Sequence, residues 1–178
     1  MKNKTEFRNY AKDKRKLLNI EKISNIICEK IKKTNIFILS KNIMIFYPLK
    51  YEINLLSLLE NDDKNFFLPK MTEEKNLDCC PYKKEDKLEK VSFNVYEPST
   101  IPTDKNILDL IILPALCVDK YKNRLGYGAG FYDRFLENIN PKTKTLVAIE
   151  DEFVFDNIPT EDFDKKVNFL ITEKSDIF

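Results

Sequence analysis

Three glycines, Gly126, Gly128 and Gly130, alternate within five residues, and the 178-residue chain contains no other glycine. Arg124 stands before this stretch and Asp133 follows it. Glycine adopts positive φ at little steric cost and lets backbone N–H groups approach a ligand closely. The stretch therefore predicts a backbone cradle for an anion, with a cation and a carboxylate at its rims; the alternative is a surface turn without a ligand. Its G-x-G-x-G spacing matches neither the dinucleotide-binding fingerprint nor the Walker motif.

The flanking segments predict how this cradle is held. Residues 109–114 form a short apolar run closed by a proline, as expected for a buried strand. After the glycines, Phe131, Phe135 and Leu136 recur at helical spacing until an Asn-Pro pair at residues 140–141. The order strand, polar turn, glycine loop and helix places unpaired N–H groups and the positive end of a helix at a phosphate.

The N-terminal segment is basic. Residues 2–16 are rich in lysine and arginine, and a weak helical periodicity continues to residue 31. Lys4 and Arg8 lie four residues apart, so they share one face of the expected helix. Taken alone, the pattern is typical of a solvated basic face, and a nonspecific contact with RNA is the alternative.

A further polar residue follows a buried strand. Residues 43–48 predict a strand that ends at Pro48, and Glu52 stands at the start of an expected helix over residues 53–59. This carboxylate could favour the helix N-terminus. It could equally bind a polar ligand at the carboxyl end of a strand, where open α/β sheets place their sites.

The remaining pattern predicts the fold. Further strands are expected at residues 66–69, 91–96, 145–149 and 167–171, with a loop or hairpin over residues 72–90. Strands that alternate with helices indicate an α/β protein, here a three-layer α/β/α sandwich with a largely parallel central sheet. We expect a single domain over residues 1–178, because this length can bury one substantial core.

Composition excludes several mechanisms. The chain has no histidine, so it cannot build Ser-His-Asp or Cys-His catalysis by itself, whereas phosphoryl transfer stays open. A net charge of +1 gives no overall attraction to nucleic acid. The adjacent pair Cys79-Cys80 could be redox-active, but two strand residues are the favoured interpretation. Without an apolar span of 18 residues or a signal core, we expect a protein of the reducing cytoplasm that does not enter membranes.

The strings at residues 109–114 and 124–136 strongly resemble the signature of 5-formyltetrahydrofolate cyclo-ligases, also called 5,10-methenyltetrahydrofolate synthetases. Weaker pieces follow in the family's order at residues 4–8, 46–52, 96–98 and 164–173, so the resemblance covers nearly the whole chain. It implies an enzyme that uses MgATP to convert 5-formyltetrahydrofolate to 5,10-methenyltetrahydrofolate, releasing ADP and phosphate. We also expect a cytoplasmic monomer that binds these small molecules and no nucleic acid.

The resemblance assigns roles to residues at matching positions. It implies catalytic roles for Arg124 and Asp133, and Mg²⁺ binding by Asp133 and Asp164. Folate contacts are implied for Tyr47, Glu52 and Tyr132. The implied ATP-binding residues are Lys4, Arg8, Arg124, Leu125, Gly126, Tyr127, Gly128, Ala129, Gly130, Phe131 and Tyr132.

Three departures from the family pattern and three alternatives stay open. Phe131 replaces a tyrosine, Ala129 stands where many relatives carry lysine or glycine, and Phe163 stands where a histidine is frequent. The first alternative is a phosphotransferase for another small molecule. The second is a folate- or nucleotide-binding regulator without turnover, and the third is an RNA-binding protein that uses residues 2–16.

Overall fold

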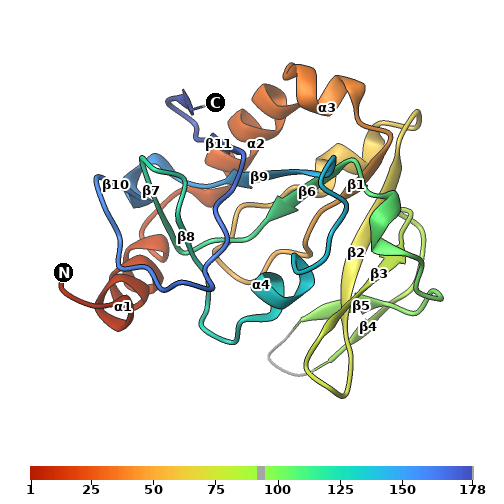
Figure 1. Ribbon diagram of the computed structural model, residues 1–178. Helices are drawn as coiled ribbons and strands as arrows, with labels where there is room; N and C mark the ends of the chain where they lie inside the picture. Colours follow the sequence, from red (N-terminus) through yellow and green to blue (C-terminus); the bar gives the residue numbers. More distant parts are fainter. Residues whose placement is uncertain (92–94, 178) are drawn as a thin grey trace.

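Seven strands form the central sheet of the computed structural model, which describes residues 1–91 and 95–177 (Figure 1). Their spatial order is β12-β11-β9-β6-β1-β2-β3. The five inner strands run parallel, and β3 and β12 pair antiparallel at the two edges. The predicted α/β fold with a largely parallel sheet is confirmed. The strands are β1 (Asn42–Met44), β2 (Asn65–Met71), β3 (Leu77–Pro81), β6 (Leu110–Leu113), β9 (Lys144–Ala148), β11 (Phe169–Ile171) and β12 (Asp176–Ile177).

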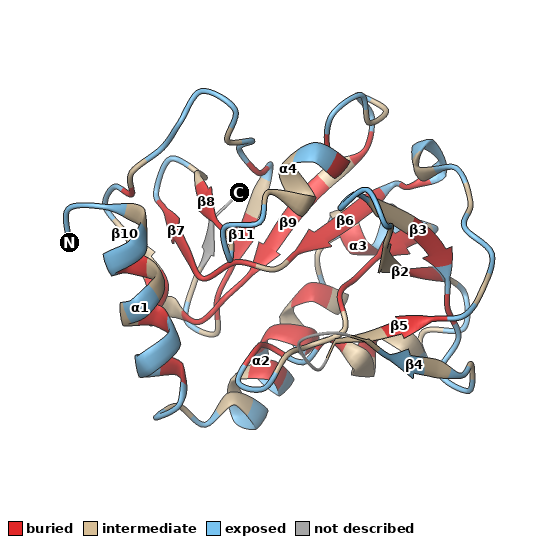
Figure 2. Cartoon of the chain, turned by 90° about the horizontal axis from the view of Figure 1, so that it is seen from below, coloured by how far each residue is buried: buried red, intermediate tan, exposed pale blue. Residues whose placement is uncertain are grey.

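The inner strands are apolar because helices and loops cover both faces of the sheet. All four residues of β6 are buried, a continuous burial that is typical of parallel strands. On one face lie α2 (Ile20–Lys32), α3 (Asn35–Leu39) and the 3₁₀ helix η1 (Leu56–Glu60). On the other face lie α1 (Lys4–Arg15) and α4 (Phe131–Phe135). Figure 2 shows the sheet as a buried layer, with the outer sides of α1 exposed.

Two smaller sheets flank this core. One joins β10 (Val154–Phe155), β7 (Cys117–Asp119) and β8 (Arg124–Leu125), and the other pairs β4 (Leu88–Lys90) with β5 (Tyr96–Pro98). The described residues also include the short 3₁₀ turns η3 (Lys105–Ile107) and η4 (Asp151–Phe153). A loop or hairpin was expected over residues 72–90; in the structure, β3 in this segment forms a hairpin with β2, which precedes the segment. The strand predicted over residues 91–96 falls partly on residues 92–94, which lie outside the described chain.

Three helix predictions were wrong in their limits. The basic helix does not continue to residue 31, because α1 ends at Arg15 and Asn19 caps a separate helix α2 by accepting a hydrogen bond from the backbone N–H of Lys22. The helix after the glycines is only one turn long. Residues 53–55 are not helical, so Glu52 starts no helix and lies in a turn in which its N–H donates to the carbonyl of Leu49.

The four cysteines are free and buried. Cys79 and Cys80 lie in β3, as predicted, and burial raises their pKa to about 12 and about 11. Both therefore stay as unreactive thiols at neutral pH. Within the described residues, no helix is both long and apolar enough to cross a membrane.

Candidate active site

The order of the strands leaves a crevice at one edge of the sheet. Strand β2 lies on one side of β1, whereas β6 lies on the other, so the direction of strand addition reverses at β1. Ligands in open α/β sheets bind outside the carboxyl ends of the strands at such a reversal. In this chain, residues 45–55 and 114–116 follow the carboxyl ends of β1 and β6. We call this region the carboxyl edge.

The glycine loop connects β8 with α4 beside this edge. The carbonyl of Leu125 accepts a hydrogen bond of 2.8 Å from Leu116, which fixes the start of the loop. Gly128 and Gly130 have φ values of 104° and 70°, a region that side chains disfavour. Because α4 has five residues, the predicted contribution of a helix dipole is small. The loop therefore offers backbone groups and neighbouring cations rather than a strong helix terminus.

Arg124 and Asp133 meet at the two ends of the loop. The Nη2 atom of Arg124 donates to Oδ1 of Asp133 at 2.8 Å, and Nη1 donates to the carbonyl of Pro114 at 3.3 Å. The arginine side chain is 3% exposed and the aspartate side chain is 23% exposed. The guanidinium also lies 5.9 Å from the ring centroid of Tyr132. The two residues predicted to be catalytic are thus brought together at the carboxyl end of β6.

Helix α1 brings two predicted phosphate ligands to the same region. Nε of Arg8 donates to the carbonyl of Gly126 at 3.0 Å. One turn earlier, Nζ of Lys4 lies 2.7 Å from Oδ2 of Asp164 and 2.6 Å from Oε2 of Glu161. The predicted shared face of Lys4 and Arg8 is confirmed. In this structure, however, Lys4 pairs with Asp164, the residue predicted to bind magnesium.

Glu52 lies in the segment that follows β1 at the carboxyl edge. It is 6% exposed, its Oε2 accepts a 2.7 Å hydrogen bond from the N–H of Leu49, and its Oε1 accepts one of 2.6 Å from the Tyr127 hydroxyl. Burial and the Glu52 charge raise the pKa of both Tyr127 and Tyr132. Arg124 partly opposes this effect at Tyr132. The charges of Arg124, on the predicted phosphate side, and of Glu52, on the predicted folate side, therefore both act on the Tyr132 hydroxyl.

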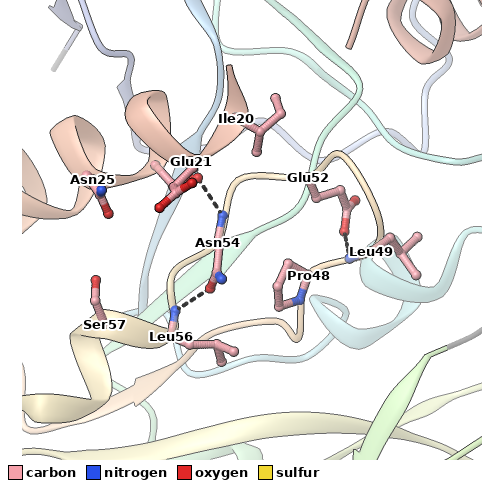
Figure 3. Close-up of a pocket in the computed structure, with 10 residues that line it drawn as sticks. Ile20, Glu21, Asn25, Pro48, Leu49, Glu52, Asn54, Leu56 and Ser57 are labelled. Atoms are coloured by element: carbon pink, nitrogen blue, oxygen red, sulfur yellow. Dashed lines mark hydrogen bonds between the residues drawn. The ribbon is translucent and has the colours of Figure 1, made fainter. Parts of the chain in front are cut away.

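A pocket of about 330 Å³ opens next to Glu52, between α2 and residues 48–57 (Figure 3). Its walls combine Pro48 and Leu49 with polar groups that include Ser24, whose hydroxyl accepts a hydrogen bond from the N–H of Asn54. The close-up shows the Glu52 carboxylate held against the backbone of Leu49. A ligand beside Glu52 would thus meet a fixed acceptor with apolar neighbours.

Tyr47 is placed differently from the other predicted folate residues. Its ring packs on that of Tyr96 in β5, with centroids 5.1 Å apart. Among the described contacts, none joins Tyr47 to Glu52 or Tyr132. The structure therefore brings Glu52 and Tyr132 towards the glycine loop and sets Tyr47 towards the small β4–β5 sheet.

The prediction missed a buried ion pair at the same edge. Nη2 of Arg15 lies 2.9 Å from Oε2 of Glu150 and donates to the carbonyl of Ala115 at 2.7 Å. Their side chains are 4% and 1% exposed. The Arg15 charge also acts on the Tyr127 hydroxyl, whose pKa it lowers against the stronger effects of burial and Glu52. One signal could have revealed Arg15: arginine occurs only four times among the 30 basic residues of this lysine-rich chain.

The donor set fits the magnesium that the resemblance implies, provided that the metal arrives with phosphate. Magnesium in phosphoryl-transfer sites is held by one or two carboxylates together with phosphate oxygens. The described residues contain no group of three or more potential ligands that would hold a metal alone. Asp133 and Asp164 use Oδ1 and Oδ2, respectively, for their cationic partners. Among the described groups, none donates to the other oxygen of either residue.

The strand order of the sheet reverses at β1, and a glycine loop and buried charges lie at the carboxyl edge beside this reversal. These features are typical of the class of α/β proteins that bind small molecules at the carboxyl ends of their strands. Residues 2–173 match the 5-formyltetrahydrofolate cyclo-ligase family. The chain therefore belongs to the 5-formyltetrahydrofolate cyclo-ligase family, which is a family of enzymes.

Individual relatives agree with this assignment. The 5-formyltetrahydrofolate cyclo-ligase of Haemophilus influenzae is 30% identical over 136 residues, which cover 70% of this chain and 72% of that protein. That of Mycolicibacterium smegmatis is 39% identical over 69 residues, 39% of this chain and 36% of that protein. The 5,10-methenyltetrahydrofolate synthetase of Aquifex aeolicus has a similar structure, with a TM-score of 0.85 and 27% identity over 97% of this chain and 91% of that one.

Proposed function

We propose that this chain converts 5-formyltetrahydrofolate to 5,10-methenyltetrahydrofolate with ATP, releasing ADP and phosphate. The observation that carries the proposal is the meeting, at one edge of the sheet, of the glycine loop with its arginines and of the buried acceptor Glu52. One part suits a polyphosphate and the other suits a neutral ring with N–H donors. The family assignment supports the same pair of substrates.

The proposed reaction has two steps. The formyl oxygen attacks the γ-phosphorus of ATP, the bond from this phosphorus to the ADP oxygen breaks, and an imidate-like phosphate forms. N10 then attacks the activated carbon, the C–O bond breaks, and the electron pair leaves with phosphate while N10 loses its proton. Phosphoryl transfer depends mainly on positioning and on charge stabilisation, which a chain without histidine can supply.

Arg8, Lys4 and Arg124 are assigned to the phosphates. Arg8 already touches the loop backbone and carries no carboxylate partner among the described residues, so its charge is free for an anion. Arg124 is held by Asp133 and by the carbonyl of Pro114, so its planar fork is preorganised to meet charge that develops in the transition state. Lys4 must exchange Asp164 and Glu161 for phosphate oxygens.

Glu52 is assigned to the pterin ring. A carboxylate has about four lone-pair sites, and the two described donors leave room for N–H groups of a substrate. Tyr132 lies between the Glu52 and Arg124 charges and is assigned to the junction of the two substrates. The folate contact assigned to Tyr47 requires that the substrate extends from Glu52 towards Tyr96.

Asp133 and Asp164 are assigned to magnesium, which supplies charge neutralisation on the phosphates when it is bound. We also propose that the active form is a monomer. The buried thiols fit a reducing compartment, and we propose the cytoplasm.

The test mixes purified protein with MgATP and 5-formyltetrahydrofolate labelled with ¹⁸O in the formyl group. We expect methenyl product and ADP in equal amounts, with the label in the released phosphate. ADP without methenyl product would indicate a different acceptor and contradict the substrate assignment. Bound folate without any product would support the noncatalytic regulator instead.

A further inference from the structure

Each of the three glycines in the loop faces the guanidinium of a different arginine. A Cβ atom at position 126 would lie 2.9 Å from Nη1 of Arg124, and one at position 128 would lie 3.1 Å from Cζ of Arg8. A Cβ atom at position 130 would lie 2.8 Å from Nη1 of Arg134. The alternating glycines therefore make room for three guanidinium groups, which come from β8, α1 and α4.

The three arginines differ in how their charge is balanced. Arg124 forms an ion pair with Asp133. Arg8 and Arg134 have no carboxylate within ion-pair distance in the described part of the chain. Their described hydrogen-bond acceptors are carbonyl groups, which leave the positive charge uncompensated. The middle and the end of the loop therefore lie between two uncompensated cations.

Arg134 has donors to spare. Its Nη2 donates to the carbonyl of Lys75 at 2.6 Å and to that of Ala129 at 3.1 Å. Its Nη1 and Nε donate to no described residue. The guanidinium also lies 5.4 Å from the ring centroid of Phe131, which orients it along the loop. Arg134 is thus held beside the glycine loop by two carbonyl groups, one from the β2–β3 turn and one from the loop. It is exposed and has unused donors.

We propose that Arg134 is a third phosphate ligand, which binds the polyphosphate of the nucleotide together with Arg8 and Arg124. This inference rests on the proposed ATP-binding role of the loop. Ala129 contributes no charge from inside the loop, and Arg134 supplies a cation at its carbonyl instead. Arginine suits this position because its planar fork can keep the contact with Ala129 through one nitrogen and donate to phosphate through another.

The use of arginine along the chain supports this assignment. The sequence contains four arginines, and all other basic residues among the 30 are lysines. Three of the four lie against the glycines, and the fourth, Arg15, lies at the carboxyl end of β6. Arginine in this chain is therefore confined to the glycine loop and the carboxyl end of β6.

The test measures the affinity of wild type, Arg134→Gln and Arg134→Lys for MgATP and for inorganic tripolyphosphate, with Lys142→Gln as the matched control. Lys142 is exposed and lies after α4, so the control removes one positive charge away from the loop. We expect Arg134→Gln to weaken both ligands by the same factor of about ten or more, because a charge-assisted hydrogen bond to phosphate is lost. Arg134→Lys should lose less, and the control should bind as wild type does.

A structural role for Arg134 predicts a different result. If its only task is to join the β2–β3 turn to the loop, Arg134→Gln lowers the melting temperature and leaves the affinity for both ligands unchanged, which would overturn the inference. Should Arg134→Gln fail to fold, Arg134→Lys decides, because wild-type affinity in that variant excludes a forked contact. Wild-type protein that binds neither ligand would overturn the ATP-binding role itself, and this inference with it.

Discussion

At the two edges of the central sheet, the larger pocket is not the one that lies beside buried charges. The amino edge carries a pocket of about 710 Å³, whereas the pocket beside Glu52 at the carboxyl edge has about 330 Å³. Yet the charged groups of the larger pocket are either exposed to solvent, as Asp62, Lys83 and Glu85 are, or have partners. Lys64 donates to the carbonyls of Ile38 and Ser40, and Lys84 pairs with Glu60 in solvent.

The carboxyl edge leaves its buried charges incompletely satisfied. In the described residues, the buried side-chain nitrogens and oxygens without a hydrogen-bond partner are Nε and Nη1 of Arg15, Nε of Arg124 and Oε1 of Glu150. Such atoms lower the stability of a folded protein. A cavity is therefore a weaker indication of function here than a group of buried charges that the protein alone does not satisfy.

The largest expected effect comes from breaking the buried pair at the carboxyl edge. Arg15→Met leaves Glu150 buried beside no cation, so the free energy of unfolding in urea should fall by about 3–5 kcal/mol. The double variant Arg15→Met/Glu150→Leu should recover most of this loss. Lys84→Gln at the amino edge should cost no more than about 1 kcal/mol, because both partners are exposed. Equal losses at the two edges would contradict the comparison.

The second prediction compares the catalytic rates of one variant at each edge. Arg124→Lys keeps a positive charge but loses the fork that contacts Asp133 and Pro114, so kcat for methenyl formation should fall about 10²–10³-fold. Lys84→Gln is the control and should react at the wild-type rate. Near-normal turnover in Arg124→Lys would mean that Arg124 does not act through paired donors.

Asp133→Asn tests whether the carboxylate of this pair serves the phosphates or only holds Arg124. With magnesium contact, turnover should fall about 10–100-fold, whereas folate affinity should stay within about twofold. The measurement is a comparison of kcat with folate binding in the absence of ATP. A parallel loss of both would indicate that Asp133 only maintains the shape of the site.

The smallest effect concerns a buried carboxylate outside both edges. Glu97 in β5 is 5% exposed and accepts a hydrogen bond from the N–H of Met71, and burial raises its pKa. The folded protein therefore binds this proton more tightly than the unfolded chain, and wild-type stability falls as the pH rises from 4.5 through the raised pKa.

Glu97→Gln keeps the acceptor for Met71 and removes this penalty. The variant should be more stable than wild type at pH 7 by no more than about 1 kcal/mol, with the difference shrinking towards pH 4. Urea unfolding at a series of pH values gives the measurement. Activity should not change, since burial of a carboxylate does not by itself make a site, and a loss of turnover in Glu97→Gln would contradict this.

The sequence predicted the parts of this molecule that depend on local pattern. Alternation of apolar strands and helices gave the fold, and the spacing of Lys4 and Arg8 placed both side chains on one helical face. The glycine loop predicted where flexible backbone and cations meet. The roles of the individual site residues stay predictions until they are measured.

The remaining features depend on contacts between distant segments, which local pattern does not encode. Arg15 joins Glu150 across 135 positions of sequence, and Lys4 reaches Asp164 across 160. Glu52 was expected at a helix start, but the turn at Leu49 and the hydroxyl of Tyr127 hold it instead. Ala129 suggested a loop without a cation. Arg134 follows Gly130 by only four residues, so helical spacing could have placed it there, but its contact with Lys75 across 59 positions could not be predicted.

The contacts of helix α1 with distant segments determine when the site can form during synthesis. The cations of this helix leave the ribosome before their partners, because Ala115, Gly126, Glu150 and Asp164 are synthesised at least 100 residues later. Contacts this distant in sequence form late in folding. A nascent chain therefore carries these cations without their partners until Asp164 has been synthesised, and the site can assemble only after that point.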